Sequence, residues 1–306
     1  MRLLSVGFLL STVSLSMPLI FAAFGGLISE RSGVINIGLE GMMLFGAFTG
    51  VAVDYWTHSA FLGLLAGVGV GAVLGAIHGL FSITIRADQI VSATAINLLG
   101  LGLTSALIAP IWGAPGVSPG VNKIHDLHLP GAGSLGSVGR FLNGLNPLDY
   151  LGLALVVVTF LVLYRRPWGL RLRACGESPD AAASSGIDVI RTRYVAVTIS
   201  GALAALGGVY LSLTQVGLFQ RGMTQGRGFI ALAAMIFGKW RPFPILAACV
   251  LLGAADAFQF RAQALGVPIP NELLLALPYI VALIALATFI GRANAPAAVG
   301  RPYVKE

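Results

Sequence analysis

Long runs without charge are the strongest constraint on this fold. Four runs of 31, 34, 27 and 19 residues hold no Asp, Glu, Lys or Arg: Tyr55–Ile85, Gln89–Asn122, Tyr194–Gln220 and Leu273–Gly291. A helix needs about 20 apolar residues to cross a bilayer. The runs are continuous, whereas a transmembrane β-barrel would need apolar and polar residues to alternate. We therefore expect an all-α polytopic membrane protein.

The hydrophobic pattern divides the chain into about nine segments, within a range of eight to ten. They form a single transmembrane domain over residues 1–306 and lie at about 5–29, 37–53, 60–83, 88–111, 148–164, 194–216, 228–238, 243–262 and 272–290. The seventh segment is too short for a full helical span, because a helix of that length covers only about half of the hydrocarbon core.

The positive charges predict the orientation. The chain has a net charge of +7, and six of its 19 Lys and Arg lie in residues 165–193. A short basic loop between spans is typical of the cytoplasmic side, and this explains the charge better than nucleic-acid binding does. Counting from this loop places 54–59, 112–147 and 263–271 outside. The N-terminus is external if all nine segments cross, but the parity changes if the seventh is re-entrant.

A charged, glycine-containing segment interrupts the first apolar region. Residues 30–41 read Glu-Arg-Ser-Gly-Val-Ile-Asn-Ile-Gly-Leu-Glu-Gly. Such charges are costly in a membrane unless they are buried in protein, paired or hydrated. Part of the pattern recurs, because Gly, Ile, Leu and Met have the same spacing at Gly33, Ile37, Leu39 and Met42 and at Gly226, Ile230, Leu232 and Met235. We predict two related halves with broken helices, as in many transporters.

The basic loop contains the pattern of a short helix. Ser178 suits the N-cap, Pro179 the first helical position, and Asp180 the positive end of the helix dipole. Gly186 suits the C-terminal cap. These residues fit a helix that docks into a partner, and they equally fit a solvated loop helix without one.

Four stretches together resemble the permeases of ABC importers in the ribose and branched-chain amino-acid class. They are residues 18–43, 86–99, 173–189 and 226–240, within a resemblance that covers roughly residues 15 to 290. The Ser-Glu-Arg-Ser-Gly-Val-Ile-Asn-Ile-Gly-Leu-Glu-Gly form at 29–41 is most similar to the nucleoside and simple-sugar branch.

The resemblance implies a permease subunit that moves nucleosides across the cytoplasmic membrane by alternating access. It also implies two ATP-binding subunits, a second permease that is a copy or a paralogue, and an extracytoplasmic substrate-binding protein. Simple sugars or branched-chain amino acids are alternative substrates. A stand-alone secondary transporter or channel is the alternative from another class.

The chain lacks a Gly-x-x-x-x-Gly-Lys-Ser/Thr phosphate loop. We therefore expect no enzymatic activity of its own and no bound cofactor, with ATP held by a partner. Residues 165–193 then form a cytoplasmic coupling loop within the domain. Its expected ATPase-coupling residues are Glu177, Ser178, Pro179, Asp180 and Gly186.

The polar residues of the apolar segments are candidates for the substrate pathway, which we expect segments 30–41 and 226–238 to line. The candidates are Glu30, Arg31, Asn36, Glu40, Asn97, Phe229 and Asp256. We expect Glu30 and Arg31 to pair with each other or with Glu40 and to fix the helix geometry. The two asparagines suit either a ribose or base edge or helix packing.

Two further points complete the site prediction. Asp256 would cost about 2.5–3.5 kcal/mol at a helix centre if it were unpaired, so we expect it to pair or to contact substrate. No metal site is expected, because His125, His128 and Asp126 in the external loop are too few to fix a coordination sphere. The sequence leaves open which nucleoside is carried.

Overall fold

A computed structural model describes residues 6–127, 136–289 and 295–304 of the chain. Over these ranges the protein is built from helices: α1 (Val6–Arg31), α2 (Leu39–Thr57), α3 (Ala60–Gly79), α4 (Gln89–Trp112), α5 (Gly136–Asn143), α6 (Pro147–Arg165), α7 (Pro167–Glu177), α8 (Pro179–Ser184), α9 (Val189–Val209), α10 (Arg227–Phe237), α11 (Pro242–Ala264) and α12 (Asn271–Phe289). Two π-helical segments, η1 (Leu80–Thr84) and η3 (Tyr210–Val216), extend α3 and α9.

Each of the nine predicted segments coincides with a helix. Among the described residues, six helices are long and apolar enough to cross a membrane: α1, α3 with η1, α4, α6, α9 with η3, and α11. Shorter apolar stretches lie in α10 and α12. The prediction of an all-α polytopic membrane protein is confirmed. Ser5 and Ile290, at the outer limits of the first and last predicted segments, lie outside the described residues.

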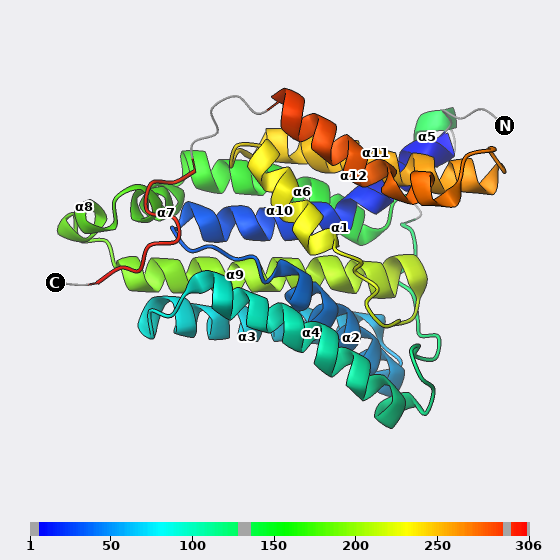
Figure 1. Cartoon of the computed structure of the whole chain (residues 1–306), viewed down its shortest axis with the longest axis horizontal. Helices are drawn as coiled ribbons and strands as arrows, with labels where there is room; N and C mark the ends of the chain where they lie inside the picture. Colours follow the sequence, from blue (N-terminus) through cyan, green and yellow to red (C-terminus); the bar gives the residue numbers. More distant parts are fainter. Residues whose placement is uncertain (1–5, 128–135, 290–294, 305–306) are drawn as a thin grey trace.

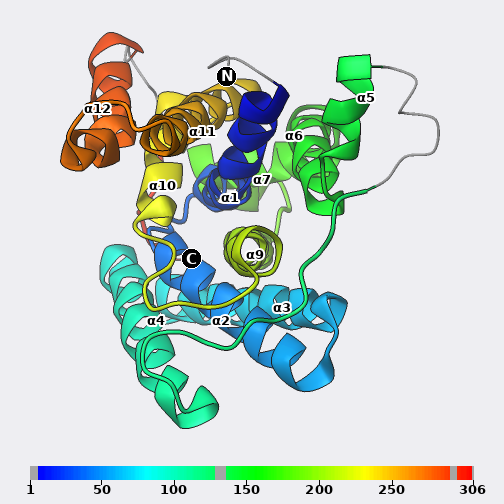
Figure 2. The same cartoon turned by 90° about the vertical axis from the view of Figure 1, so that its right-hand side faces the viewer.

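The two central helices, α1 and α9, each pack against elements of the other half of the chain (Figure 2). Helix α1 packs on α9, α11 and α10, while α9 packs on α3, α2 and α1. Neither half can therefore bury its own central helix, and the two halves form one interlocked domain.

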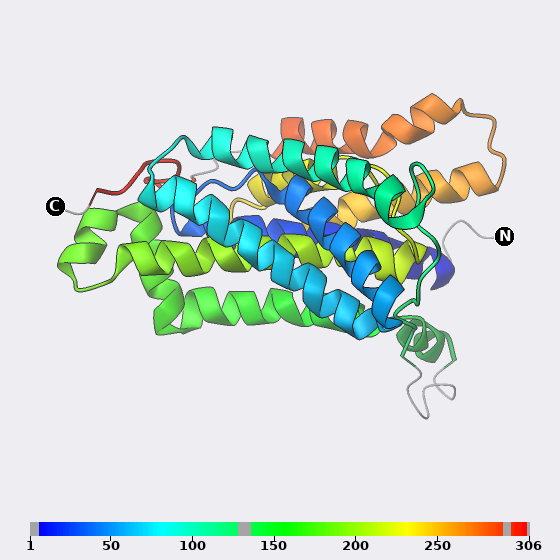
Figure 3. The same cartoon turned by 90° about the horizontal axis from the view of Figure 1, so that it is seen from below.

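The two halves contain the same order of elements along the chain, but the corresponding central helices run in opposite directions (Figures 1 and 3). A long central helix, a non-helical connection and three further helices form each half: α1 with α2–α4, and α9 with α10–α12. Helix α1 ends, and α9 begins, at the end of the molecule that carries α7 and α8. The predicted related halves are confirmed, and their opposite directions give the inverted repeat found in many transporters.

The ends of the molecule agree with the predicted topology (Figure 3). Residues 54–59, 112–127 and 263–271 lie at the end opposite α7 and α8, together with the start of α1. Helix α10 runs back toward the α7–α8 end, so the seventh segment preserves the alternation. If α7 and α8 lie on the cytoplasmic side, as the basic loop predicts, the start of α1 lies outside, in agreement with the predicted N-terminus.

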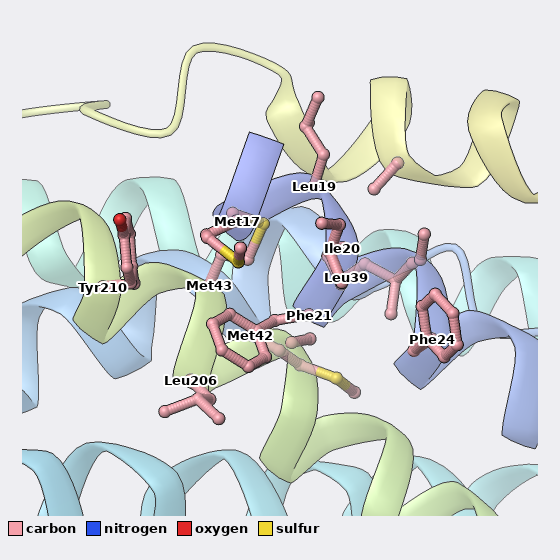
Figure 4. Close-up of a cluster of buried hydrophobic side chains, with 14 of the residues drawn as sticks. Met17, Leu19, Ile20, Phe21, Phe24, Leu39, Met42, Met43, Leu206 and Tyr210 are labelled. Carbon is pink, nitrogen blue, oxygen red and sulfur yellow. The ribbon is translucent and has the colours of Figure 1, made fainter. Parts of the chain in front are cut away.

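Apolar side chains from both halves form the core (Figure 4). Met17 and Phe21 of α1 lie near Met42 and Met43 of α2, and Phe24 of α1 lies near Leu39 of α2. Leu206 of α9 and Tyr210 of η3 complete the cluster from the second half. Dense packing, rather than exclusion of water, must hold these helices together, because lipid is as apolar as the side chains.

A stripe of glycines on α3 permits close packing against α2 and α9. Gly63, Gly67, Gly71 and Gly75 recur at every fourth position and are all buried. A Cβ atom at Gly75 would lie 2.5 Å from the Val197 carbonyl oxygen of α9. Such spacing of small residues is a known route to close helix contact in membranes.

We predict that Gly71→Ala destabilises the protein by about 1–3 kcal/mol, because its Cβ would overlap the Gly201 carbonyl oxygen and the Ala205 side chain. Gly69→Ala is the matched control on the same helix, since a Cβ there meets no atom within 4 Å. Denaturant-induced unfolding in mixed micelles measures both variants. Equal stabilities would show that the stripe does not set this packing.

Candidate functional site

The two non-helical connections bring the N-termini of α2 and α10 into the interior (Figure 1). Residues 32–38 run inward from the end of α1 to the start of α2, and residues 217–226 run inward from η3 to the start of α10. The first N–H groups of a helix have no partner within it. At membrane depth these groups must be bonded by protein.

Glu40 of α2 supplies the partners for α10. Its Oε1 accepts hydrogen bonds from the Thr224 hydroxyl at 2.5 Å and the Gly226 N–H at 2.8 Å. Its Oε2 accepts one from the Gly228 N–H at 2.7 Å. The side chain is 9% exposed. A carboxylate at a helix N-terminus is stabilised by the helix dipole, and its hydrogen bonds are charge-assisted. One residue of the first half therefore caps the broken helix of the second.

Asn36 organises the first connection. Its Oδ1 accepts the Gly38 N–H at 3.0 Å, and its Nδ2 donates to the Ser200 hydroxyl of α9 at 2.9 Å. His78 of α3 contacts the neighbouring Ile35 carbonyl oxygen through Nε2 at 2.8 Å. Asn36 is fully buried, so its polar atoms serve the protein in this conformation.

Asn97 of α4 holds the start of α2 from the other side. Its Oδ1 accepts the Gly41 N–H at 2.8 Å, and its Nδ2 donates to the Ile37 carbonyl oxygen at 2.9 Å. Together, Asn36 and Asn97 bond the backbone on both sides of the point where α2 begins. Side-chain hydrogen bonds thus take the place of the backbone hydrogen bonds that this part of the chain lacks, and they fix the start of α2.

Phe229 and Asp256 have different surroundings from these buried groups. Phe229, in the first turn of α10, is 50% exposed. Asp256 of α11 is partly buried and is attracted by the charge of Arg227, at the first position of α10. Of the seven predicted pathway residues, Phe229 is the one that presents a large apolar side chain at the surface near the two breaks.

Glu30 and Arg31 bind the turn that follows α10. The Trp240 indole N–H donates to Glu30 Oε2 at 2.7 Å, and Arg31 donates to the Trp240 carbonyl oxygen from Nε at 3.1 Å and from Nη2 at 2.7 Å. Arg31 also lies 4.0 Å from a carboxylate oxygen of Glu177 at the end of α7. The expected pairing of Glu30 and Arg31 with each other or with Glu40 is therefore wrong. Their partners lie more than 140 residues away in the sequence.

Arg193 joins four segments at the same end of the molecule. It is 1% exposed and donates to the carbonyl oxygens of Ser32 at 3.1 Å, Cys175 at 3.3 Å and Arg301 at 3.2 Å. These oxygens belong to the first connection, α7 and the C-terminal segment.

Burial raises the pKa of the Cys175 thiol in α7, which keeps the thiol protonated and unreactive.

The C-terminal segment packs against the same junction. The Ala298 N–H donates to the Gly176 carbonyl oxygen at 2.9 Å, and the Gly300 N–H donates to the Gly33 carbonyl oxygen at 3.0 Å. Residues 295–304 therefore link α7 to the first connection through backbone hydrogen bonds, in parallel with Arg193.

Helix α8 projects from this junction (Figure 1). It starts at Pro179 as predicted, but the Ser178 side chain at the N-cap makes no capping hydrogen bond. Ala182 packs inward with Cys175 and Val189, while Asp180 is exposed. Two hydrogen bonds close the C-terminus, from the Ile187 N–H to the Ala182 carbonyl oxygen and from the Gly186 N–H to that of Ala183, with a φ of 80° at Gly186. This is the Schellman geometry that glycine favours.

Sequence reasoning missed three residues of these networks. Trp240 lies at the end of the stretch 226–240 and Arg193 in the basic loop at 165–193, and neither pattern marks them as site residues. Thr224 lies in a turn without an apolar pattern. Arg193 did carry a signal, because it directly precedes the long charge-free run that begins at Tyr194.

The described residues contain no cluster of three or more His, Cys, Asp or Glu side chains suited to hold a metal ion. His128, named above with His125 and Asp126, lies outside the described residues.

We predict that Glu40→Ala lowers the free energy of unfolding by about 3 kcal/mol or more, because it leaves buried N–H and O–H donors unpaired. Glu40→Gln should cost less, since one acceptor oxygen remains. Asp88→Asn is the matched control: Asp88 caps α4 at an exposed site, with Oδ1 accepting the Ile90 N–H at 2.8 Å, and Asn caps equally well. Unfolding in mixed micelles measures all three. If Glu40→Ala were as mild as Asp88→Asn, the capping role would be refuted.

Comparison with known proteins identifies the family. A family model described as the permease component of branched-chain amino acid transport systems matches residues 8–286. The guanosine ABC transporter permease protein NupQ of Bacillus subtilis is 40% identical over 96% of this chain and 95% of its own length. The nucleoside ABC transporter permease protein NupC of Lactococcus lactis is 35% identical over 95% and 94%. The putative glucose ABC transporter permease protein TsgC13 of Haloferax volcanii is 38% identical over 87% and 81%.

The same three organisms each contain a second, more distant relative. In Bacillus subtilis it is the guanosine ABC transporter permease protein NupP, 26% identical over 83% of this chain and 72% of its own length. The counterparts in Haloferax volcanii and Lactococcus lactis are 26% and 24% identical. With the family model matching most of its length and its multiple apolar helices, this chain belongs to the branched-chain amino acid type family of ABC transporter permeases, as a multi-pass protein of the cytoplasmic membrane.

Proposed function

We propose that this chain is the permease subunit of a nucleoside importer and works by alternating access. The observation that carries the substrate class is the similarity to NupQ and NupC, which are named for guanosine and nucleosides and match nearly the whole chain at 40% and 35% identity. A sugar remains the second candidate, since TsgC13 is 38% identical and is named for glucose.

We place the substrate route beside the two breaks, on the side of the molecule where α2, α4, α10 and α12 lie (Figure 2). Asn36 and Glu40 already bond the backbone, so they shape the route rather than bind substrate. Phe229, half exposed at the start of α10, can stack on a nucleobase, because every base offers a π-face to an aromatic ring. This assignment favours Phe229 over Asn36 as a point of substrate contact.

The partners supply energy and substrate. An ATP-binding component docks on α8, and an extracytoplasmic binding protein delivers substrate at the opposite end. Two ATP-binding subunits per importer follow from a pair of permeases with one α8 each.

Movement of α8 can reach both breaks through short connections. Helix α7 contacts the end of α1 through Glu177 and Arg31, and Arg193 ties α7 to the first connection. Arg31 also binds Trp240, directly after α10. A pull on α7 and α8 would therefore shift the starts of α2 and α10 together, because Glu40 joins these helices.

The second permease is a paralogue rather than a copy. Three organisms each hold two relatives of this chain, one at 35–40% identity and one at 24–26%, and each pair carries one substrate name. If each importer contains two different permeases, each organism should hold one relative that is more similar to this chain and one that is less similar. Co-expression of two differently tagged copies tests this, and recovery of both tags in one importer would contradict it.

We predict that Ala181→Trp on the exposed face of α8 abolishes ATP-dependent uptake without loss of folded protein, because the ring would block docking in a partner's groove. Val157→Trp, on an exposed position of α6, is the matched control and should retain uptake. Uptake into membrane vesicles with and without ATP measures both. Continued uptake by Ala181→Trp that follows an ion gradient would place the chain among secondary transporters.

The substrate class is tested on the cognate binding protein. We expect nucleosides to raise its melting temperature in a thermal-shift screen, because the binding protein selects the substrate before the permease receives it. Glucose, pentoses and branched-chain amino acids serve as the comparison ligands. Stabilisation by glucose or leucine alone would reject the nucleoside assignment.

A further inference from the structure

A basic groove lies at the α7–α8 end, between α6 and the start of α11. Its volume is about 520 Å³, and its lining includes Arg31, Arg173 and Arg241 together with the rings of Phe160, Tyr164 and Phe243. None of the residues that line it carries a carboxylate. Neither the route beside the breaks nor α8 uses this groove.

The charges in the groove are only partly compensated. Arg31 has a carboxylate of Glu177 at 4.0 Å, but Glu177 is 56% exposed and lies outside the lining. Arg173 repels Arg31, and its buried Nε has no hydrogen-bond partner in the structure. Three like charges in one groove are unfavourable without an anion nearby, and a buried unpaired donor adds to the cost. The groove is therefore built to receive a negative group.

The aromatic rings place this group at the membrane surface. The Arg173 guanidinium lies 4.9 Å from the centre of the Tyr164 ring, and the Phe160 and Phe243 ring centres lie 5.1 Å apart. Aromatic residues gather at the interface between lipid tails and headgroups. Farther along the same two membrane-spanning helices, Val157 of α6 and Val250 of α11 are exposed on the surface, where lipid would lie against them.

We propose that this groove binds the headgroup of an anionic phospholipid of the cytoplasmic leaflet. The phosphate lies among the three arginines, and the acyl chains lie along the exposed apolar faces of α6 and α11. Basic pockets between transmembrane helices on the cytoplasmic side commonly bind such headgroups. Guanidinium groups suit the task, because their planar donors match phosphate oxygens in pairs.

Native mass spectrometry on the full-length chain, purified with its bound subunits, tests the proposal. Phosphatidylglycerol and phosphatidylcholine with the same acyl chains are the probes. We expect the wild type to retain phosphatidylglycerol preferentially. Arg173→Gln and Arg241→Gln should each lower this preference by about fivefold. Arg171→Gln, on the same helix as Arg173 but outside the groove, is the control and should leave it unchanged.

Equal retention of the two lipids by the wild type would overturn the proposal without recourse to any variant. An equal loss in Arg171→Gln and Arg173→Gln would do the same, since it would reflect net charge alone. Displacement of phosphatidylglycerol by millimolar inorganic phosphate would identify the groove as a site for a free anion instead. If Arg173→Gln fails to fold, Arg173→Lys replaces it, and we expect a smaller but measurable loss because the paired donors are gone.

Discussion

The structure depends on one carboxylate. Two helices begin inside the bundle, and each exposes backbone donors where lipid and packed side chains offer no water. Glu40, from the first half of the chain, satisfies the start of α10 in the second half with bonds from Thr224, Gly226 and Gly228. Because α1 and α9 each pack against the other half as well, this bond lies at the centre of an interlocked domain rather than at its edge. The second break is therefore stabilised by a residue of the first half, while Asn36 and Asn97 hold the start of α2.

A second set of contacts connects this centre to the α7–α8 end of the molecule, where we propose that the ATP-binding partner docks. Arg31 and Arg193 both bind backbone oxygens, and these oxygens belong to segments remote from each other in the sequence. An arginine that binds a backbone oxygen is tied to the segment that carries this oxygen, and not only to one side chain. In the proposed mechanism, a displacement at α8 would therefore shift the junction of α1, α7 and the turn at Trp240 together and so reach the breaks.

The sequence predicts the features of this protein that a lipid environment requires, namely the membrane-spanning segments and their order. Charge-free runs must span, so the nine segments and their order follow from residues such as Tyr194–Gln220. The first break also follows, because charges and glycines at 30–41 cannot continue a lipid-exposed helix. The second was placed wrongly, since 226–238 is mostly helix α10 and the break precedes it at 217–226. The opposite directions of the halves follow from the four predicted segments between α1 and α9, because an even number of intervening crossings makes these two helices run in opposite directions. The partners of Glu30 and Arg31 do not follow, because Trp240 lies about two hundred residues away and no local pattern links them.

The central claim is that Glu40 and Thr224 hold the two halves together across the breaks, and a double-mutant cycle tests it most directly. Glu40→Ala, Thr224→Val and the double variant are compared by their free energies of unfolding in mixed micelles. A coupling energy of about 1 kcal/mol or more is expected from a buried, charge-assisted hydrogen bond. Effects that add to within about 0.5 kcal/mol would contradict the account, because they would show that the two side chains do not act on each other.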